Sequence, residues 1–408
     1  MQRYLDHFFK LAQLPRCSGS TEVIQKYIID CVQEYGYHVE VDGSGNVLAS
    51  KKGAQTTLQA HYDMVCIGDV KNMEVVVENG YIFSKNSSLG ADNAIACAMM
   101  LALMQEGAKV DCLFTNDEEI GLIGAKNIDL TLKNKRLLNL DAQEYGKIYL
   151  GCAGGVDLEF SASNDYVDTT KPNQYEVMCN SQGGHSGVDI DKGIENSLKQ
   201  IVAFLAKKDV ELVSIKGGER ANAIAAYAKA VVRAKDLQSD EKVKVVAVNS
   251  SKDRVLKNST ALLNLLDTLP NGVLKYDEQL QAVQDSCNLA LLHNNSFTIS
   301  IRSMQESGLD KTVTMLKEHF SGYKVREFSR YEPWEPKVTA FAKEVKQAYK
   351  DAEFAAIHAG LECAILSKKF PDLEIVSIGP DIYFPHSVKE KCNLASCEKI
   401  FKLIKILL

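Results

Sequence analysis

The feature that most constrains the fold of this chain is the alternation of helices and short apolar strands along its first part. A helix is predicted to start at Ser20 or Thr21 and to end near Tyr35, because Gly36 follows, and an apolar helix is predicted over 94–106. Strands are predicted over 38–41, 47–51, 56–60, 110–115 and 137–140. This order predicts an α/β domain with a largely parallel sheet that helices cover on both faces.

Two changes in composition divide the 408-residue chain, which is long for a single core. Residues 164–174 are rich in Asn, Asp, Thr and Pro, and YEPWEP at 331–336 contains two prolines. Helices over 194–207, 259–268 and 309–319 and strands over 176–180, 223–232 and 296–301 lie between these breaks. A helix over 337–349 and a strand over 374–378 follow. We therefore predict one domain from 1–174 plus 335–408, with an α+β domain of 175–334 inserted into it.

Charge and hydropathy exclude several classes of protein. The net charge of −6 argues against nucleic-acid binding, which needs a basic face. No apolar run reaches the length of a membrane span, and the first residues lack the features of a signal peptide, so we expect a cytoplasmic protein with no membrane partner. The eleven cysteines include no CxxC pair, which predicts buried free thiols in a reducing compartment.

Histidines and carboxylates follow the predicted strands at their carboxyl ends. His61 ends TTLQAH, Glu118 and Glu119 follow VDCLFTND, Asp141 ends RLLNLD, and His386 comes shortly after EIVSIGP. In open α/β sheets, ligands bind at the carboxyl ends of the strands. Four strands that each deliver a histidine or a carboxylate to this edge therefore predict a functional site.

Each motif also has a structural interpretation when it is taken alone. His61 and Asp63 would point the same way from an extended backbone, so Asp63 could orient a metal-binding His61, although a core histidine is commoner. Asp92 precedes an apolar helix and could simply cap it. Glu118 and Glu119 could be a solvated acidic turn. The apolar strand before them favours one carboxylate on a metal and the other facing an activated water.

Together these residues supply two histidines, three carboxylates and one further acid. Zinc binds imidazole nitrogen and carboxylate oxygen, and a bridging carboxylate with one histidine and one carboxylate for each ion would complete a two-metal site. Manganese and cobalt suit such nitrogen and oxygen ligands as well.

The motifs HYD, LGADN, NDEEIG, NLD and FPHS occur in the order seen in the co-catalytic zinc aminopeptidase, carboxypeptidase and aminoacylase family, which this chain resembles. LQAHYDMV, GCAGG, GGHSGVDI, HAGLEC and FPHS make it most similar to the cytosolic aminoacyl-histidine dipeptidase (peptidase D) branch. The resemblance covers essentially the whole chain. It implies a doubly wound α/β zinc-peptidase domain with an inserted α+β lid that also forms a homodimer.

The resemblance also implies a role for each metal-site residue. Asp92 would bridge two zinc ions, and Glu118 would be the general base, with Asp63 orienting a histidine. The terminal zinc ligands would be His61, Glu119, Asp141 and His386.

Three residues of the inserted domain match lid positions in the same family. His185 in GGHSG would stabilise the oxyanion, and in dimeric relatives this histidine comes from the partner subunit. Asn222 in ERANAIA and Arg302 in SISIRSM would hold substrate, with Arg302 binding its terminal carboxylate. His185 could instead be only a turn residue, and Arg302 a surface charge.

The predicted function is that of a dizinc metallopeptidase that hydrolyses dipeptides, with Xaa-His among the candidates. The inserted segment is shorter than the dipeptidase branch leads us to expect, so Xaa-His specificity is not carried over. Alternatives with the same metal centre are a tripeptide aminopeptidase and an N-acyl amino acid deacylase. An alternative of another class is a catalytically silent metal- or peptide-binding protein, and a simpler one is an α/β protein whose acids are surface residues.

Overall fold

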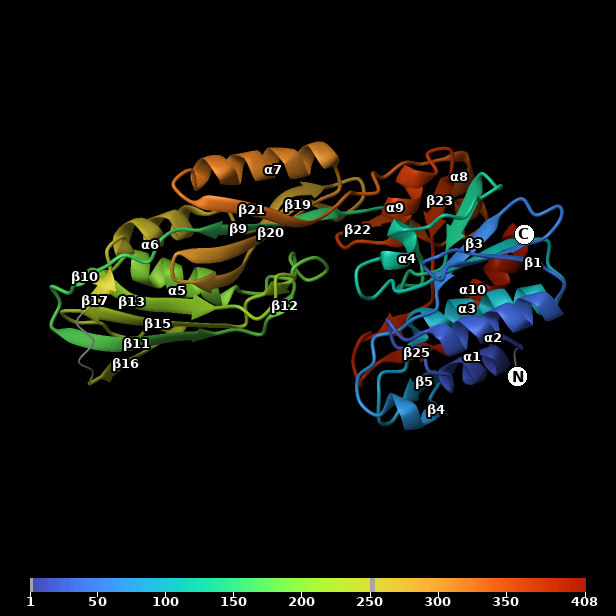
Figure 1. Cartoon of the computed structure of the whole chain (residues 1–408), viewed down its shortest axis with the longest axis horizontal. Helices are drawn as coiled ribbons and strands as arrows, with labels where there is room; N and C mark the ends of the chain where they lie inside the picture. Colours follow the sequence, from blue (N-terminus) through green and yellow to red (C-terminus); the bar gives the residue numbers. More distant parts are fainter. Residues whose placement is uncertain (1–2, 250–253) are drawn as a thin grey trace. The chain divides into compact units, whose positions relative to one another are not determined.

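The computed structural model describes residues 3–249 and 254–408, which divide into two compact units, shown in Figure 1. Unit 1 comprises Met1–Gly151, Pro336–Ala356 and Leu361–Leu408, and unit 2 comprises Cys152–Glu335 and Ile357–Gly360. The first boundary therefore lies earlier than the 174/175 boundary that composition suggests. The reason is that β9 (Gly154–Ser161) pairs with β20 (Ser296–Ser303) and β21 (Lys324–Tyr331) and so belongs to the sheet of unit 2.

Unit 1 is built on an eight-stranded sheet in the order β1-β2-β6-β3-β7-β23-β8-β22. Its central strands β6, β3, β7 and β23 are parallel, whereas β1, β2 and β8 pair antiparallel with their neighbours. Leu137 and Leu138 point to opposite faces of β7, and both are fully buried, so the sheet is covered on both faces. The strand bounds are β1 His38–Val41, β2 Val47–Ser50, β3 Thr57–His61, β6 Asp111–Thr115, β7 Arg136–Asn139, β8 Lys147–Cys152, β22 Glu353–Ile357 and β23 Glu374–Ser377.

The helices of unit 1 pack through apolar faces onto this sheet and onto one another. Helix α3 contributes fourteen buried residues and is apolar all round, which is typical of a central helix. A separate four-stranded sheet, β24-β25-β5-β4, lies in the same unit. The bounds are α1 Arg3–Ala12, α2 Glu22–Glu34, α3 Ala91–Gln105, α4 Ile123–Lys126, α8 Ala340–Ala348, α9 Glu362–Lys369, α10 Leu394–Leu407, β4 Val75–Glu78, β5 Tyr81–Ser84, β24 Ile382–Tyr383 and β25 Lys391–Asn393.

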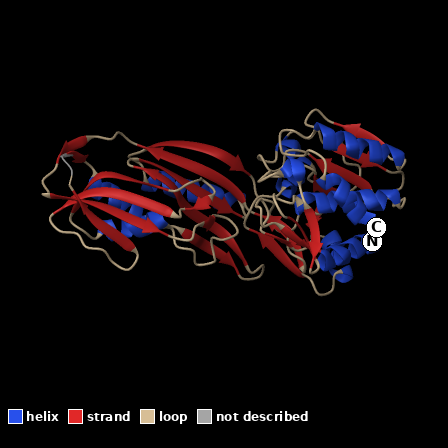
Figure 2. Ribbon diagram, turned by 90° about the horizontal axis from the view of Figure 1, so that it is seen from below, coloured by secondary structure: helices blue, strands red, loops and turns tan. Residues whose placement is uncertain are grey.

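Unit 2 is an α+β unit whose nine-stranded sheet runs β16-β11-β15-β13-β19-β20-β9-β21, with β18 paired to β19. Helices α5, α6 and α7 share one hydrophobic core with this sheet, and Figure 2 shows them grouped behind its strands. The remaining bounds are β11 Asn173–Asn180, β13 Val210–Gly217, β15 Tyr227–Ala234, β16 Val243–Val248, β18 Gly272–Asp277, β19 Ala282–His293, α5 Ser197–Ala206, α6 Ser259–Thr268 and α7 Glu306–His319.

Two short strand pairs complete unit 2. Strand β10 (Tyr166–Asp168) pairs with β17 (Arg254–Leu256), and β12 (Gly184–His185) pairs with β14 (Ala223–Ile224). The single strand predicted over 223–232 is wrong, because β14 and β15 are separate. The carbonyls of Ala225 and Ala226 between them accept hydrogen bonds from Ser197 and Ser181 rather than from a sheet neighbour.

The prediction that every cysteine is a free thiol is wrong for two of them. Cys17 and Cys66, 49 residues apart, form a disulfide, while the other nine cysteines are free and buried. Short-range spacing could not indicate this bond, because tertiary pairing of the two segments brings the sulfurs together. Within 3–249 and 254–408, no helix has the length and apolar character needed to span a membrane.

Candidate metal centre

The carboxyl ends of three adjacent parallel strands in unit 1 deliver the candidate residues to one place. His61 is the last residue of β3, where it lies opposite Thr115 of β6. Glu118 and Glu119 come three and four residues after the end of β6. Asp141 follows β7, the other parallel neighbour of β3. The register between these neighbouring strands therefore brings their ends, and the candidate residues at them, to the same edge of the sheet.

Asp92 lies between two histidines that are far apart in the sequence. Its Oδ1 is 3.2 Å from Nε2 of His61, and its Oδ2 is 3.1 Å from Nε2 of His386. The contacts of Asp92 do not support the alternative that it caps helix α3, because its carboxylate oxygens are hydrogen-bonded to the side chains of His61, His386 and Gln143. Asp92 is only 5% exposed, and its carboxylate is directed at the two imidazoles.

Two groups of ligand atoms share this carboxylate. His61 Nε2 is also 3.3 Å from Asp141 Oδ1, and His386 Nε2 is 2.9 Å from Glu119 Oε1. The ligand atoms of His61, Asp92 and Asp141 all lie within 4.8 Å of one another, as do those of Asp92, Glu119 and His386. This arrangement can hold two cations with Asp92 between them.

The electrostatics of the group show that it needs positive charge. Burial raises the pKa of Glu118 well above its usual value and raises that of Asp141 to about 6. Burial lowers the pKa of His386, but Asp92 and Glu119 outweigh it and raise that pKa to about 11. Without cations, these clustered groups therefore bind protons more readily, because protonation reduces the repulsion between neighbouring carboxylates. Divalent cations would meet the same need, and this nitrogen and oxygen donor set suits zinc, manganese or cobalt.

Asp63 connects the first histidine to the acidic loop. Its buried carboxylate lies 3.4 Å from His61 Nδ1 and accepts the backbone N–H groups of Glu118 at 3.0 Å and Glu119 at 3.2 Å. Ser18 Oγ donates a further hydrogen bond of 2.7 Å. With Asp63 on the Nδ1 side, the Nε2 atom of His61 is left directed at Asp92 and Asp141.

A buried polar network supports the site from within the sheet, and the sequence analysis missed it. Glu362 Oε2 accepts hydrogen bonds of 2.6 Å from Gln59 Nε2 and from Thr115 Oγ1. Gln59 Oε1 accepts a hydrogen bond from Asn139 Nδ2. The Oδ1 atom of Asn139 in turn accepts a hydrogen bond from the backbone N–H of Asp141. Glu362 is the fifth residue of the HAGLEC motif. Its position beneath the strand ends is a consequence of tertiary packing that no local pattern indicates.

Arg16 and Glu390, which the sequence did not single out, bind the backbone of the loop before Asp92. The buried guanidinium of Arg16 donates from Nη2 to the carbonyls of Leu89 and Gly90, each at 3.0 Å. The buried Glu390 carboxylate accepts the N–H groups of Leu89 at 2.9 Å, Gly90 at 2.8 Å and Asp92 at 3.3 Å. Gly90 has φ +64°, and a Cβ there would lie 2.4 Å from Arg16. The cation of Arg16 thus binds the carbonyl groups of the loop before Asp92, and the anion of Glu390 binds its N–H groups.

We expect Arg16→Met to lower the free energy of unfolding of unit 1 by about 3–5 kcal/mol, because the buried carbonyls of Leu89 and Gly90 would each lose a hydrogen bond from a charged donor, worth roughly 1.5–3 kcal/mol. Differential scanning calorimetry should show a fall in Tm of roughly 6–20 °C for a unit of this size. The control is Arg136→Met. Arg136 forms a partly exposed ion pair with Glu344, which should be worth no more than ~1 kcal/mol. Equal Tm values for the two variants would contradict the assigned role of Arg16.

In unit 2, the pairing of β12 with β14 brings His185 opposite Ala223, next to Asn222. His185 Nδ1 accepts the backbone N–H groups of Gly187 and Val188, each at 3.2 Å. Nδ1 is therefore unprotonated, and in the neutral ring the proton is on Nε2, which is the nitrogen able to donate.

Arg302 lies on β20 with only 8% of its surface exposed, so it is not a surface charge. Its Nη1 donates 2.7 Å to the hydroxyl of Tyr331, whose ring lies against β9 at Gly155, where a Cβ would come within 2.7 Å of the ring. His358, another missed residue, is 2.7 Å from Ser286 Oγ. Burial and then Arg302 lower the pKa of His358 to about 3, so this imidazole is neutral.

Comparison with known proteins agrees with this geometry. The model of Peptidase family M20/M25/M40 matches residues 57–408. The cytosol non-specific dipeptidase of Escherichia coli (strain K12) is 30% identical over 472 residues, covering 99% of this chain and 96% of that protein. The alignment is longer than this chain, so the relative contains segments that this chain lacks.

Solved structures give the same result for the fold. The crystal structure of aminoacylhistidine dipeptidase from Vibrio alginolyticus matches with a TM-score of 0.83 and 26% identity, covering 99% of this chain and 96% of that one. Aminopeptidase PepT from Bacillus cereus matches with a TM-score of 0.60 at 15% identity, over 99% and 97% of the two chains. The predicted α/β class with an inserted domain and the family resemblance are thereby confirmed. The chain belongs to Peptidase family M20/M25/M40 and is a metallopeptidase.

Proposed function

We propose that this protein is a dizinc dipeptidase of the cytoplasm that acts on free short peptides. The observation that carries the proposal is the position of Asp92, whose two carboxylate oxygens lie 3.2 Å and 3.1 Å from the nitrogens of two histidines that belong to different ligand groups. His61 and Asp141 would hold one ion, and Glu119 and His386 the other. The names of the Escherichia coli and Vibrio alginolyticus relatives support dipeptides as the substrate class.

The protein's own groups would share the remaining chemistry with the metal. Two zinc ions, when bound, would supply Lewis acidity and lower the pKa of water. Glu118 would accept the proton of the attacking water and pass it to the leaving amine. Burial raises the pKa of Glu118, which is the direction that favours a general base over an ordinary surface carboxylate. Asp63 would keep His61 in its orientation.

In unit 2, we assign substrate positioning to His185, Asn222 and Arg302. The Nε2–H group of His185 would donate to the oxygen of the scissile carbonyl as charge develops on it. The guanidinium of Arg302 would bind the terminal carboxylate of the peptide, which restricts the substrate to short free peptides. We also propose that the protein is a homodimer through unit 2, as its family resemblance implies.

The test is a substrate panel offered to protein that has been stripped with a chelator and then given back zinc, manganese or cobalt. The panel contains free dipeptides, Xaa-His dipeptides, the same dipeptides as C-terminal amides, tripeptides and N-acetyl amino acids. We expect cleavage of free dipeptides to return with metal, and the amides to be cleaved more slowly because they offer Arg302 no carboxylate.

Other outcomes would change the assignment. Preferential cleavage of tripeptides or of N-acetyl amino acids would replace the dipeptidase by one of these two activities. Metal binding without cleavage of any compound would make the protein a binding protein. The relative rates with Xaa-His dipeptides would define side-chain preference.

A further inference from the structure

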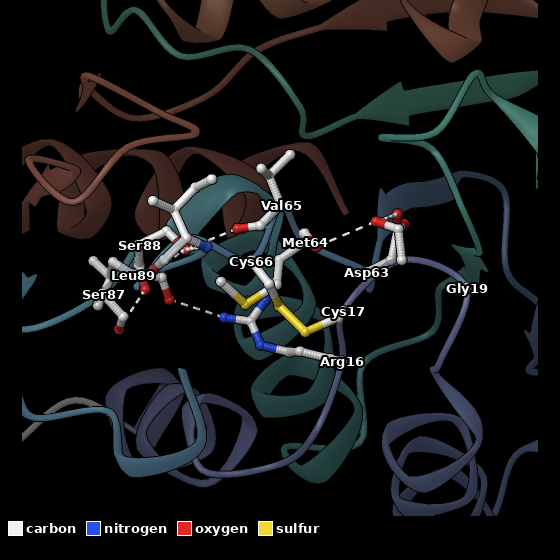
Figure 3. The surroundings of a disulfide bond; sticks show 12 residues. Arg16, Cys17, Gly19, Asp63, Met64, Val65, Cys66, Ser87, Ser88 and Leu89 are labelled. Carbon is white, nitrogen blue, oxygen red and sulfur yellow. Dashed lines mark hydrogen bonds between the residues drawn. A yellow bond between two sulfur atoms is a disulfide. The ribbon is translucent and has the colours of Figure 1, made fainter. Parts of the chain in front are cut away.

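The Cys17–Cys66 disulfide lies where three segments of unit 1 meet, the segments around Cys17, Cys66 and Ser88, as Figure 3 shows. Cys17 stands between Arg16 and Ser18, and Cys66 follows Asp63 by three positions. The bond therefore joins the segment that contacts Asp63 to the loop that begins with Asp63.

Backbone and side-chain hydrogen bonds align the three segments around this bond. Ser18 N–H donates to the carbonyl of Met64 at 3.2 Å, and Met64 N–H donates to the carbonyl of Arg16 at 3.0 Å. Ser88, in the loop before Asp92, donates from Oγ to the carbonyl of Val65 at 2.8 Å. The segments thus form one junction next to the ligand group.

The two residues that flank Cys17 contact both aspartates or their loops. Ser18 Oγ donates to Asp63 at 2.7 Å, and Arg16 donates to the carbonyls of Leu89 and Gly90, just before Asp92. Neither contact is covalent. The disulfide is the covalent link that holds residues 16–18 against the rest of the junction.

The bonded cysteines differ from the other nine in their accessibility. Cys17 and Cys66 are both partly exposed, whereas the nine free cysteines are all buried. This difference favours attack by a thiol reagent on the bonded pair over reaction with the buried thiols.

We propose that Cys17–Cys66 is a reversible redox tether of the metal centre, opened by dithiol reductants and closed by low-molecular-weight disulfides. A thiolate of the reductant attacks one sulfur of the bond and releases the other cysteine as a thiolate, which takes up a proton. The second thiol of the reductant then displaces the first cysteine. The protein gains two thiols, and the reductant leaves as its own disulfide. One glutathione disulfide reverses the exchange: the thiolate of one cysteine attacks it, releases one glutathione thiol and leaves a protein–glutathione mixed disulfide. The second cysteine then displaces the other glutathione as a thiol, so two glutathione thiols leave for each bond formed.

The proposed effect of the disulfide on metal binding rests on the metal site assigned under the proposed function. With the bond open, residues 16–18 lose their covalent link to the loop that begins with Asp63. We expect the hydrogen bonds of Ser18 to Asp63 and of Arg16 to the loop before Asp92 to weaken as a result. Groups that orient metal ligands change metal affinity by roughly 10–100-fold when they are lost. Reduction should therefore speed the transfer of metal from the protein to a competing chelator by about 10-fold.

The experiment compares the metal-loaded protein after treatment with glutathione disulfide and after treatment with dithiothreitol, each reagent being removed before measurement. Thiols are counted in denaturant, and zinc transfer to a coloured chelator is followed in the native state without peptide. We expect nine thiols in the oxidised form and eleven in the reduced form, since nine of eleven cysteines are free in the structure, with faster zinc transfer from the reduced form.

The double variant Cys17→Ser/Cys66→Ser should transfer zinc at the fast rate with either treatment, and Cys31→Ala, which removes a buried thiol elsewhere, should respond as the wild type does. If the double variant does not fold, the reversible change in the wild type still decides. Eleven thiols after glutathione disulfide, or equal zinc transfer in both forms, would overturn the proposal. A redox response without cleavage of any peptide would refute the proposed function and leave the tether intact.

Discussion

Glu118→Gln is expected to lower kcat for dipeptide hydrolysis by about 10²–10⁴-fold, the usual contribution of a general base. The amide keeps the size of the side chain but cannot accept the water's proton. Glu118 also supplies its backbone N–H to Asp63 at 3.0 Å, and this bond survives the substitution. Metal content, measured by atomic emission, should therefore stay at the wild-type value, and the loss should appear in kcat more than in KM.

The matched control is Asp117→Asn, which removes one negative charge from the neighbouring residue. Asp117 accepts the N–H of Gly19 at 2.6 Å, and asparagine can keep this bond. Asp117 also has φ +50°, a conformation that asparagine tolerates. We expect Asp117→Asn to retain most of the activity. A Glu118→Gln variant that turns over like Asp117→Asn would remove Glu118 from the mechanism.

Asp92→Asn is expected to have the second large effect, on metal stoichiometry. The amide of asparagine has a single oxygen, so it cannot offer one ligand atom to the ion beside His61 and another to the ion beside His386. The binding free energy of a structural zinc ion is ~10–16 kcal/mol. If four ligands contribute equally, the loss of one ligand costs about 2.5–4 kcal/mol, which lowers the affinity for the affected ion by ~10²–10³-fold. Titration should show one tight ion in place of two, with dipeptide hydrolysis lost.

Asp69→Asn serves as the control for this charge change. Asp69 is exposed, and it accepts hydrogen bonds from Asn72 outside the ligand group. Its variant should bind two ions and keep its activity. If Asp92→Asn also binds two ions with unchanged affinity, Asp92 does not bridge them, and the assignment of the two ligand groups would have to be revised.

Local patterns in the sequence were sufficient to locate most of the structure around the site. The strand predicted over 56–60 is β3 at Thr57–His61, and the helix predicted over 94–106 is α3 at Ala91–Gln105. Hydrophobic periodicity marks such elements because each must bury an apolar face. The rule that ligands bind at the carboxyl ends of parallel strands then brought His61, Glu119 and Asp141 to one edge.

The N-terminus of α3 shows where local patterns are ambiguous. An aspartate just before an apolar helix is equally suited to capping the helix and to binding a metal, and neither sequence spacing nor composition separates the two. Contacts with His61 and His386, which lie 31 positions before Asp92 and 294 positions after it, favour the metal-binding role.

The sequence by itself thus determined the α/β class, the inserted second unit and the identity of the residues that gather at the strand ends, because these follow from hydrophobic periodicity and from residue chemistry. Only the tertiary structure decided which residues support them. Arg16 and Glu390 around the loop before Asp92, Glu362 beneath β3 and β6, and the Cys17–Cys66 bond all depend on contacts between segments distant in the sequence. Such contacts are selected by packing and by the need to satisfy buried polar groups, and neither leaves a local pattern.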